Sequence, residues 1–509
     1  MKRATLLALA AAFGGSAMVA VGAAGMLAAP RAAEAKPAKL KPAACAALAK
    51  PGLFDQTTVS SAVAVAGDAD KGLPAYCEVT AVISPTPGSK IGVVYRLPAA
   101  WNGKVLGLGG GGWAGDVKLI AAIEGLQRGY ATLQTDAGHD PANLWNSTWS
   151  ADPDMATDFA FRGVHLMTVV GKQVAVKYYG QAQSKAYFQG CSTGGRQGLM
   201  EVQRFPDDYD GVIAAAPVYN LTVQTTAVLR DNILTQPGGR LTTAALSLVN
   251  KAVLKACDAK DGLEDGIVAD PRACDWDPAE IQCKDGQSGD DCLSKGQAAT
   301  LQAVYTGVQN FDGRVAAWPL SRGGELGWSV FLPTGEAKTD VSGGGMSGLR
   351  ATIFGDPNYD LSKFDQDADL ASVMTSPFGR AYNADNPAIS AFTGHGGKLL
   401  MWHGWYDPGP SPLATIRYYS QVKGTVADAG SSVRLFVAPG VSHCGGGPGP
   451  DKIDILAALD AWVSTGQAPD SVIAAKPKAG ISRPLCAYPM KAVYKGSGDP
   501  NDAGSFACH

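Results

Sequence analysis

Gly190-Cys191-Ser192-Thr193-Gly194 decides how this chain of 509 residues is expected to fold. The pentapeptide has G-x-S-x-G spacing, follows the apolar run Ala186-Tyr187-Phe188 and precedes a helix-like run at 196–205. In a strand–turn–helix context this spacing predicts a nucleophile elbow, a sharp turn that exposes the serine hydroxyl at the end of a strand. A second cysteine lies beside a histidine, in His443-Cys444, near the other end of the chain.

Apolar runs that alternate with helical patterns surround the pentapeptide. Strand-like runs lie at 91–97, 104–108, 130–134, 397–402 and 433–437, and helical patterns lie at 161–179 and 453–463. Alternating strands and helices predict a mostly parallel sheet with helices on both faces. Together with the pentapeptide, the pattern predicts an α/β-hydrolase fold with a doubly wound, mostly parallel sheet.

The alternation stops between residues 218 and 392. This part of the chain has four cysteines, many aspartates and glycines, and irregular apolar spacing, which indicates a large inserted lid domain. The predicted organisation is therefore a signal peptide at 1–35, a first part of the hydrolase core at 36–217, the lid at 218–392 and a second part of the core at 393–509.

The N-terminus resembles an export signal. Lys2-Arg3 precedes an uncharged, Ala-rich stretch that extends to Pro30, and Ala33-Glu34-Ala35 fits a small-x-small cleavage site. The pattern predicts a secretory signal, with an uncleaved membrane anchor as the alternative. The formal net charge of -3 gives no indication of a nucleic-acid partner. We expect a secreted or periplasmic protein with no membrane attachment after cleavage.

Ten cysteines follow the predicted signal, and an oxidising compartment would let them pair. Buried free thiols are the alternative. The chain has no C-x-x-C pair, so a structural zinc site is not favoured.

A serine hydroxyl becomes an effective nucleophile when a histidine accepts its proton and a carboxylate orients that histidine. In α/β hydrolases these residues follow in the order serine, Asp or Glu, histidine. Asp407 and His443 each come just after a predicted strand, and sites in open α/β sheets form at the C-terminal ends of strands. Ser192, Asp407 and His443 are therefore the predicted triad. His403 is interpreted as a partly buried, hydrogen-bonded histidine.

An oxyanion hole needs backbone N–H groups near the nucleophile. One is predicted from Thr193, the residue after the serine, and the other from the glycine run at 109–112, which follows an early strand. Gly110 and Gly111 are the predicted donors. A phosphate-binding loop is the alternative, but the run lacks the Gly-Lys-Ser/Thr ending and the acidic partner of such loops.

Cys191-Ser192, Asp407 and His443-Cys444 resemble the CS-D-HC motif of the tannase and feruloyl esterase family. The resemblance covers residues 45–508, nearly the whole chain after the predicted signal. It implies a serine carboxylic ester hydrolase with an α/β-hydrolase core and a lid. Other similar stretches are Trp101-Asn102-Gly103, Thr135-Asp136-Ala137-Gly138-His139, His403-Gly404-Trp405 and the Gly/Pro-rich segment at 445–450.

The resemblance implies a disulfide between Cys191 and Cys444 under the active site. Physical reasoning supports this pair, because a serine and histidine within about 3 Å of each other bring their neighbours close. A bond that closes so long a loop contributes several kcal/mol in the chain-entropy treatment. By order and by the resemblance, the other expected pairs are Cys45–Cys77, Cys257–Cys274, Cys283–Cys292 and Cys486–Cys508.

The resemblance also implies a structural Ca²⁺ ion in the lid. Asp258, Asp261 and Asp265 lie in one short stretch with turn-forming glycines, and several carboxylates suit a hard cation that prefers oxygen ligands. The backbone carbonyls of Leu263 and Ile267 would complete the ligand set, as the resemblance implies. A solvated acidic turn is the alternative.

Members of the family hydrolyse aromatic esters, so the resemblance implies a small aromatic ester substrate of plant cell-wall or tannin origin. Feruloyl-type (hydroxycinnamoyl) esters come first; a galloyl ester or a terephthalate monoester is the alternative. Pro408-Gly409-Pro410 stands where the terephthalate-ester relatives carry an aromatic residue. A non-catalytic secreted phenolic- or carbohydrate-binding protein and a peptidase are alternatives from other classes. Candidate pocket walls are Trp276, Trp318, Trp328, Tyr359 and Trp405, and candidate carboxylate partners are Arg350 and Arg380.

Overall fold

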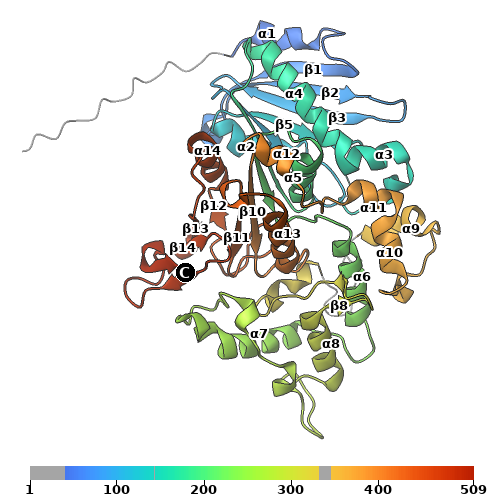
Figure 1. Cartoon of the computed structure of the whole chain (residues 1–509), viewed down its shortest axis with the longest axis vertical. Coiled ribbons are helices and arrows are strands. Elements are labelled where there is room, and N and C mark those ends of the chain that lie inside the picture. The colour runs from blue at the N-terminus through green and yellow to red at the C-terminus, as the bar shows by residue number, and fades with distance from the viewer. Residues whose placement is uncertain (1–39, 141, 143, 332–344) are drawn as a thin grey trace, which may run out of the picture. The chain divides into compact units, whose positions relative to one another are not determined.

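The computed structural model describes residues 40–140, 142, 144–331 and 345–509, and these belong to one compact unit (Figure 1). The predicted signal peptide at 1–35 lies outside the described residues. None of the described helices is both long and apolar enough to span a bilayer.

Nine strands form the central sheet, in the order β1-β2-β3-β5-β4-β6-β7-β10-β11. The strands from β5 to β11 in this order are parallel, whereas β1, β2 and β3 pair antiparallel at one edge and β3 is antiparallel to β5. The bounds are β1 Thr57–Val65, β2 Tyr76–Ile83, β3 Ile91–Pro98, β4 Lys104–Leu108, β5 Ala131–Thr135, β6 Lys185–Cys191, β7 Gly211–Ala215, β10 Lys398–Gly404 and β11 Val433–Ala438.

Alternate side chains of the parallel strands enter two buried layers, one on each face. On one face Val212 and Met401 pack in an apolar cluster with α4, α5 and α13; on the other, Ile213 and Leu400 pack with α2 and α14. Helices therefore cover both faces, which confirms the predicted doubly wound α/β architecture. The helices are α2 Leu119–Gln127, α4 Gly163–Tyr179, α5 Thr193–Arg204, α13 Pro412–Thr425 and α14 Ile455–Thr465.

Between β7 and β10 the chain leaves the central sheet and forms an insertion with apolar clusters of its own. Figure 1 shows α6, α7 and α8, coloured from green to olive-yellow, below the sheet and α9, α10 and α11 in orange at its side. The predicted lid limits, 218 and 392, fall between β7 and α6 and inside α12. The elements are α6 Thr222–Leu234, α7 Thr243–Cys257, α8 Lys295–Thr306, β8 Val308–Gln309, β9 Val315–Ala317, α9 Met346–Phe354, α10 Asp369–Thr375, α11 Pro377–Tyr382 and α12 Ser390–Gly394.

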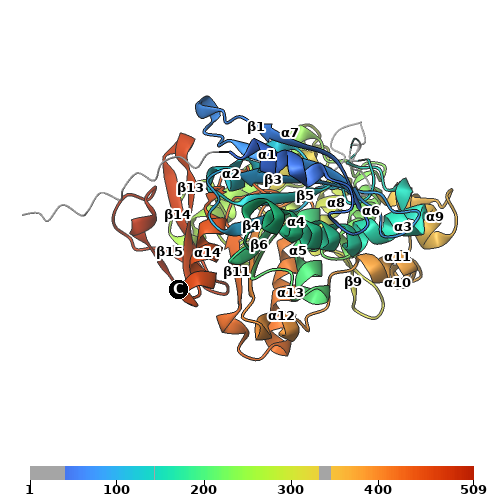
Figure 2. The same ribbon diagram turned by 90° about the horizontal axis from the view of Figure 1, so that it is seen from above.

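Of the remaining elements, α1 and the C-terminal strands lie at the two ends of the described chain, and α3 lies between β5 and α4. The C-terminal strands lie on the opposite side of the molecule from α9, α10 and α11 (Figure 2). They form a three-stranded sheet and a hairpin. The bounds are α1 Pro42–Ala46, α3 Pro153–Thr157, β12 Lys452–Ile453, β13 Ser471–Lys476, β14 Ile481–Cys486, β15 Ala492–Tyr494 and β16 Phe506–Cys508.

Five disulfides join the ten cysteines, and the structure has no free thiol among them. The pairs are those that the resemblance implies: Cys45–Cys77, Cys191–Cys444, Cys257–Cys274, Cys283–Cys292 and Cys486–Cys508. The number of bonds fits a protein that folds in an oxidising compartment.

Candidate active site

Ser192 lies on the sharp turn between the end of β6 and the start of α5. Its backbone angles, φ 62° and ψ -123°, are ones that residues with a Cβ rarely adopt. The flanking glycines permit the turn, because a Cβ on Gly190 would lie 2.4 Å from the backbone carbon of Gly194. The structure thus has the strand–turn–helix geometry that the pentapeptide predicts.

Asp407 and His443 meet in the loops that follow β10 and β11. Nδ1 of His443 donates a hydrogen bond to Oδ2 of Asp407 at 2.7 Å, and the backbone N–H of Gly409 donates to Oδ1 at 2.8 Å. Burial alone would raise the pKa of Asp407, but the proximity of His443 and the hydrogen bonds from His403 and His443 lower it to about 2. The ionised carboxylate holds the hydrogen of His443 on Nδ1, which leaves Nε2 able to accept a proton.

The Cys191–Cys444 disulfide connects the residues next to Ser192 and His443. Its Cα atoms are 6.0 Å apart, and 253 positions separate the two cysteines in the sequence. Cys444 has a φ of 58°, a left-handed backbone that is unusual for a residue with a side chain. The bond therefore ties the loop that carries His443 to the strand that ends at the serine.

Ser192 and His443 line one narrow cavity of about 70 Å³. Its aromatic wall consists of Trp113, Trp145 and Phe331. The ring of Phe331 stands edge-on to the ring of His443, with centroids 5.1 Å apart. The cavity is thus an apolar slot with a nucleophile and a base at one side, the usual character of a small-molecule site.

Helix α6, from the insertion, supplies the other wall through Val223, Gln224, Ala227 and Arg230. The guanidinium of Arg230 is buried and donates to the carbonyl oxygens of Pro408, at 2.9 Å, and of Trp318. Burial lowers the pKa of Arg230 to about 9, against the opposing effect of the nearby carboxylate charge. The group is therefore still positively charged at neutral pH.

The oxyanion donors predicted in the glycine run need a correction. The N–H of Gly110 donates to the side chain of Gln197 at 2.9 Å, and the N–H of Gly111 donates to a backbone carbonyl of the same turn at 3.1 Å. Both groups are thus engaged away from the reaction site, and the glycine of the run that lines the cavity, beside Thr193, is Gly112. Its φ of 58° turns the backbone there.

The pocket walls and carboxylate partners predicted from the sequence lie outside the cavity. Trp276, Trp328 and Trp405 fill the apolar cluster of the insertion, and Tyr359 stacks on Phe354 with ring centroids 3.9 Å apart. Large rings fill the core when their surroundings bury them on all sides. The residues predicted as walls or carboxylate partners all lie outside the cavity lining: Trp276, Trp318, Trp328, Tyr359, Trp405, Arg350 and Arg380.

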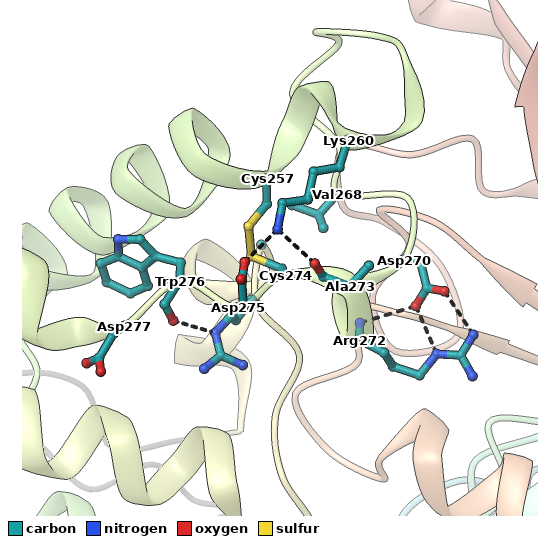
Figure 3. The surroundings of a disulfide bond; sticks show 12 residues. Cys257, Lys260, Val268, Asp270, Arg272, Ala273, Cys274, Asp275, Trp276 and Asp277 are labelled. Carbon is teal, nitrogen blue, oxygen red and sulfur yellow. Dashed lines mark hydrogen bonds and ion pairs between the residues drawn. A yellow bond between two sulfur atoms is a disulfide. The ribbon is translucent and has the colours of Figure 1, made fainter.

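The acidic stretch at 258–267 follows α7 and is joined to the next turn by the Cys257–Cys274 disulfide (Figure 3). Beside this bond, Lys260 donates to the carbonyl oxygen of Ala273 at 2.9 Å and pairs with Asp275 at 2.6 Å. The disulfide and these two contacts therefore anchor the N-terminal end of the stretch to the turn at 273–275.

Within this stretch, the carboxylate of Asp258 accepts the backbone N–H groups of Gly266 and Ile267, at 2.9 and 3.2 Å, and Asp265 pairs with Arg483 at 3.0 Å. Burial and the negative charges of Asp265 and Asp258 raise the pKa of Asp261 against its hydrogen bond from a backbone N–H. The oxygen-rich, negatively charged donor set fits a hard cation. Arg483 compensates one of these charges.

Among the described residues, three potential metal-ligating atoms lie within 4.8 Å of one another at His165, Glu201 and Asp208. Nδ1 of His165 lies 2.7 Å from Oδ2 of Asp208, and the ammonium of Lys172 donates to the carbonyl oxygen of Asp208. Burial, together with the charge of Asp208, raises the pKa of Glu201 well above its usual value. The nearby ammonium of Lys172 and the raised pKa of Glu201 both reduce the negative charge that this cluster offers to a cation.

Comparisons with known proteins identify the family of the chain. The family described as tannase and feruloyl esterase matches residues 77–509. Mono(2-hydroxyethyl) terephthalate hydrolase from Piscinibacter sakaiensis is 33% identical over 86% of this chain and 85% of its own, and a probable feruloyl esterase from Arthroderma benhamiae is 34% identical over 82% of each.

Among solved structures, feruloyl esterase B from Aspergillus oryzae has a TM-score of 0.82 at 28% identity, and the match covers 92% of this chain and 100% of that chain. The tannin acyl hydrolase from Aspergillus niger, 22% identical, shares the fold with a TM-score of 0.73 over 92% and 94% of the two chains. The chain therefore belongs to the tannase and feruloyl esterase family and is a carboxylic ester hydrolase with an α/β-hydrolase fold.

Proposed function

We propose that this protein hydrolyses small aromatic esters, with hydroxycinnamoyl (feruloyl-type) esters as its main substrates, through a Ser192–His443–Asp407 triad and an acyl-enzyme. The observation that carries the proposal is the cavity in which the serine and the histidine face three aromatic side chains. A planar aromatic acid matches such an apolar slot with few polar groups.

In the proposed acylation step, Oγ of Ser192 attacks the ester carbonyl carbon while Nε2 of His443 accepts its proton. Asp407 stabilises the resulting imidazolium through the 2.7 Å hydrogen bond at Nδ1. The same imidazolium then donates its proton to the leaving alcohol. Water, activated by His443 in turn, releases the aromatic acid from the serine.

The negative charge that develops on the carbonyl oxygen needs backbone donors. We propose the N–H groups of Thr193 and Gly112, because both residues line the cavity beside the nucleophile. Thr193 also donates its hydroxyl hydrogen to the carbonyl oxygen of Gly112, which holds the two backbones together.

A terephthalate monoester is a second candidate substrate, because Arg230 places a positive charge in the cavity wall. A related hydrolase of this type is 33% identical to the chain. Galloyl esters are the other alternative that the family resemblance gives.

The deciding experiment is a hydrolysis panel with methyl ferulate, methyl gallate and a terephthalate monoester. We expect the highest kcat/KM with methyl ferulate, and a clear preference for either of the others would contradict the assignment. A fluorophosphonate probe is expected to label Ser192 and to fail with Ser192→Ala, while Ser184→Ala, an exposed serine before β6, is the matched control. A non-catalytic binding protein would not be labelled.

We further propose that the 258–267 stretch binds a structural Ca²⁺ ion through the carboxylates of Asp258, Asp261 and Asp265 and the carbonyls of Leu263 and Ile267. The ion would neutralise the charges that raise the pKa of Asp261. Chelator treatment is expected to lower the melting temperature, and Asp261→Asn to abolish that response. An unmoved melting temperature after chelation would contradict the site.

The five disulfides support the proposal that the chain is exported to an oxidising compartment, secreted or periplasmic, after removal of residues 1–35. Amino-terminal sequencing of the protein from culture medium and periplasm tests both the cleavage and the destination.

A further inference from the structure

His403 lies on β10, four residues before Asp407, and its ring is completely buried. Its Nε2 lies 3.0 Å from Oδ2 of Asp407, the same oxygen that accepts the hydrogen bond of His443. The same Nε2 lies 3.1 Å from the carbonyl oxygen of Pro410. Because both neighbours only accept hydrogen bonds, their positions assign the hydrogen of His403 to Nε2.

The other ring nitrogen is held as well. Nδ1 of His403 lies 2.7 Å from Oγ1 of Thr415, a buried residue of α13. A neutral ring with its hydrogen on Nε2 accepts the hydrogen of the Thr415 hydroxyl at Nδ1. Both the tautomer and the orientation of His403 are thus set from two sides of the fold.

We propose that His403 is a positioning residue for ester hydrolysis, acting through the carboxylate of Asp407. The inference rests on the proposed triad. One carboxylate oxygen serves two N–H donors, so the bond from His403 weakens the hold of that oxygen on the hydrogen of His443. His403 therefore fixes the carboxylate in place and also keeps His443 free to act as a base at lower pH.

Ionisable groups face this carboxylate from three different elements: His403 on β10, His443 after β11 and Arg230 on α6. The guanidinium of Arg230 donates to the carbonyl oxygen of Pro408 and not to the carboxylate. Removing His403 therefore changes the donors on Oδ2 while it leaves the positive charge of Arg230 in place. The effect of the shared oxygen can be measured separately from that of the charge.

The test compares His403→Leu with His403→Gln, using 4-nitrophenyl acetate as a small ester substrate. His403→Leu removes the donor and is expected to lower kcat about tenfold to a hundredfold, the range for losing one hydrogen bond to a charged group. The acid limb of kcat/KM, which reports the general base, is expected to move up by roughly one pH unit. His403→Gln keeps an N–H donor and is expected to recover much of both.

His165→Leu is the matched control. This histidine also binds an aspartate through a 2.7 Å contact, with Asp208, but it lies outside the residues that line the cavity. We expect its acid limb to coincide with that of the wild type. If His403→Leu lowers thermal stability but leaves the acid limb unmoved, His403 has only a structural role and the inference is overturned.

An NMR measurement that does not depend on enzyme turnover tests this inference independently of the proposed function. The NMR resonance of the Nδ1 hydrogen of His443 is expected to move downfield in His403→Leu, because its bond to Asp407 strengthens. An unchanged resonance overturns the inference, whereas a shifted resonance without any ester hydrolysis overturns the proposed function alone. If His403→Leu does not fold, Thr415→Val removes the hydroxyl on Nδ1 and is expected to give a smaller shift; no shift would refute the inference.

Discussion

The double substitution Cys191→Ala and Cys444→Ala removes the Cys191–Cys444 disulfide. Comparing this variant with one that lacks a different disulfide distinguishes a loss of stability from a loss of kcat. Cys191 and Cys444 are 253 positions apart, so the bond closes a loop of that length around the whole insertion. The chain-entropy relation gives about 5.5 kcal/mol of stabilisation for such a loop. Two shorter disulfides inside it shorten the free chain only slightly.

The matched control is Cys45→Ala with Cys77→Ala, a pair 32 positions apart whose cysteines lie in the buried core. The same relation gives about 4 kcal/mol for this bond. The active-site variant is therefore expected to lose more stability than the control, by about 2 kcal/mol. The two variants also differ in turnover, because only the first frees the left-handed backbone at Cys444 and the loop that carries His443.

The expected outcome is a fall in kcat per folded molecule of about a hundredfold for the active-site variant, the scale for displacing a catalytic group by about 1 Å. The control variant should keep wild-type kcat. Denaturant unfolding gives the stability of each variant, and fluorophosphonate titration gives the concentration of competent sites. Equal kcat values per folded molecule in the two variants would refute the reasoning that this bond positions the base.

Three more substitutions test other parts of the structure. Burial and the charge of Asp208 raise the pKa of Glu201, so the stability that Glu201 contributes is present in acid and is lost as the pH rises through its folded-state pKa. Glu201→Gln should therefore raise the melting temperature at about pH 8 more than at about pH 5, as measured by scanning fluorimetry. Asp407→Asn should lower kcat by about 10³ to 10⁴, since the amide misorients the base, and a fall below tenfold would contradict the triad. Ala227→Phe fills the cavity from α6 and should lower kcat/KM for methyl ferulate at least about tenfold while 4-nitrophenyl acetate is still hydrolysed; equal losses would argue against an acyl site there.

The sequence was sufficient to predict the parts of the site that depend on local pattern. Ser192 sits between an apolar strand and a helix, and the carboxyl ends of parallel strands converge, so Asp407 and His443 could be placed by their strands alone. The disulfide at Cys191 needed the family resemblance, because spacing does not determine the pairing of ten cysteines.

Other parts had no local signal. The edge strand β1 is rich in Ser, Thr and Ala and has partly exposed residues on both faces, so it lacks the alternation that marks a strand. The four residues at 109–112 are all glycines, so the sequence does not indicate which backbone N–H lies next to the cavity. The turn at Gly112 is known only from the structure. Trp145 and Phe331 reach the cavity from loops, whose positions depend on tertiary packing.

The residues of the candidate site come from three consecutive parts of the chain: the segment before the insertion between β7 and β10, the insertion itself and the segment after it. Ser192 precedes the insertion and Asp407 and His443 follow it, whereas one complete wall of the cavity, α6, belongs to it. The wall that α6 forms can therefore change during evolution while the strands that carry Ser192, Asp407 and His443 stay the same. Exchanging inserted segments between relatives, with the flanking strands kept, offers a route to new ester preferences on an unchanged reaction centre.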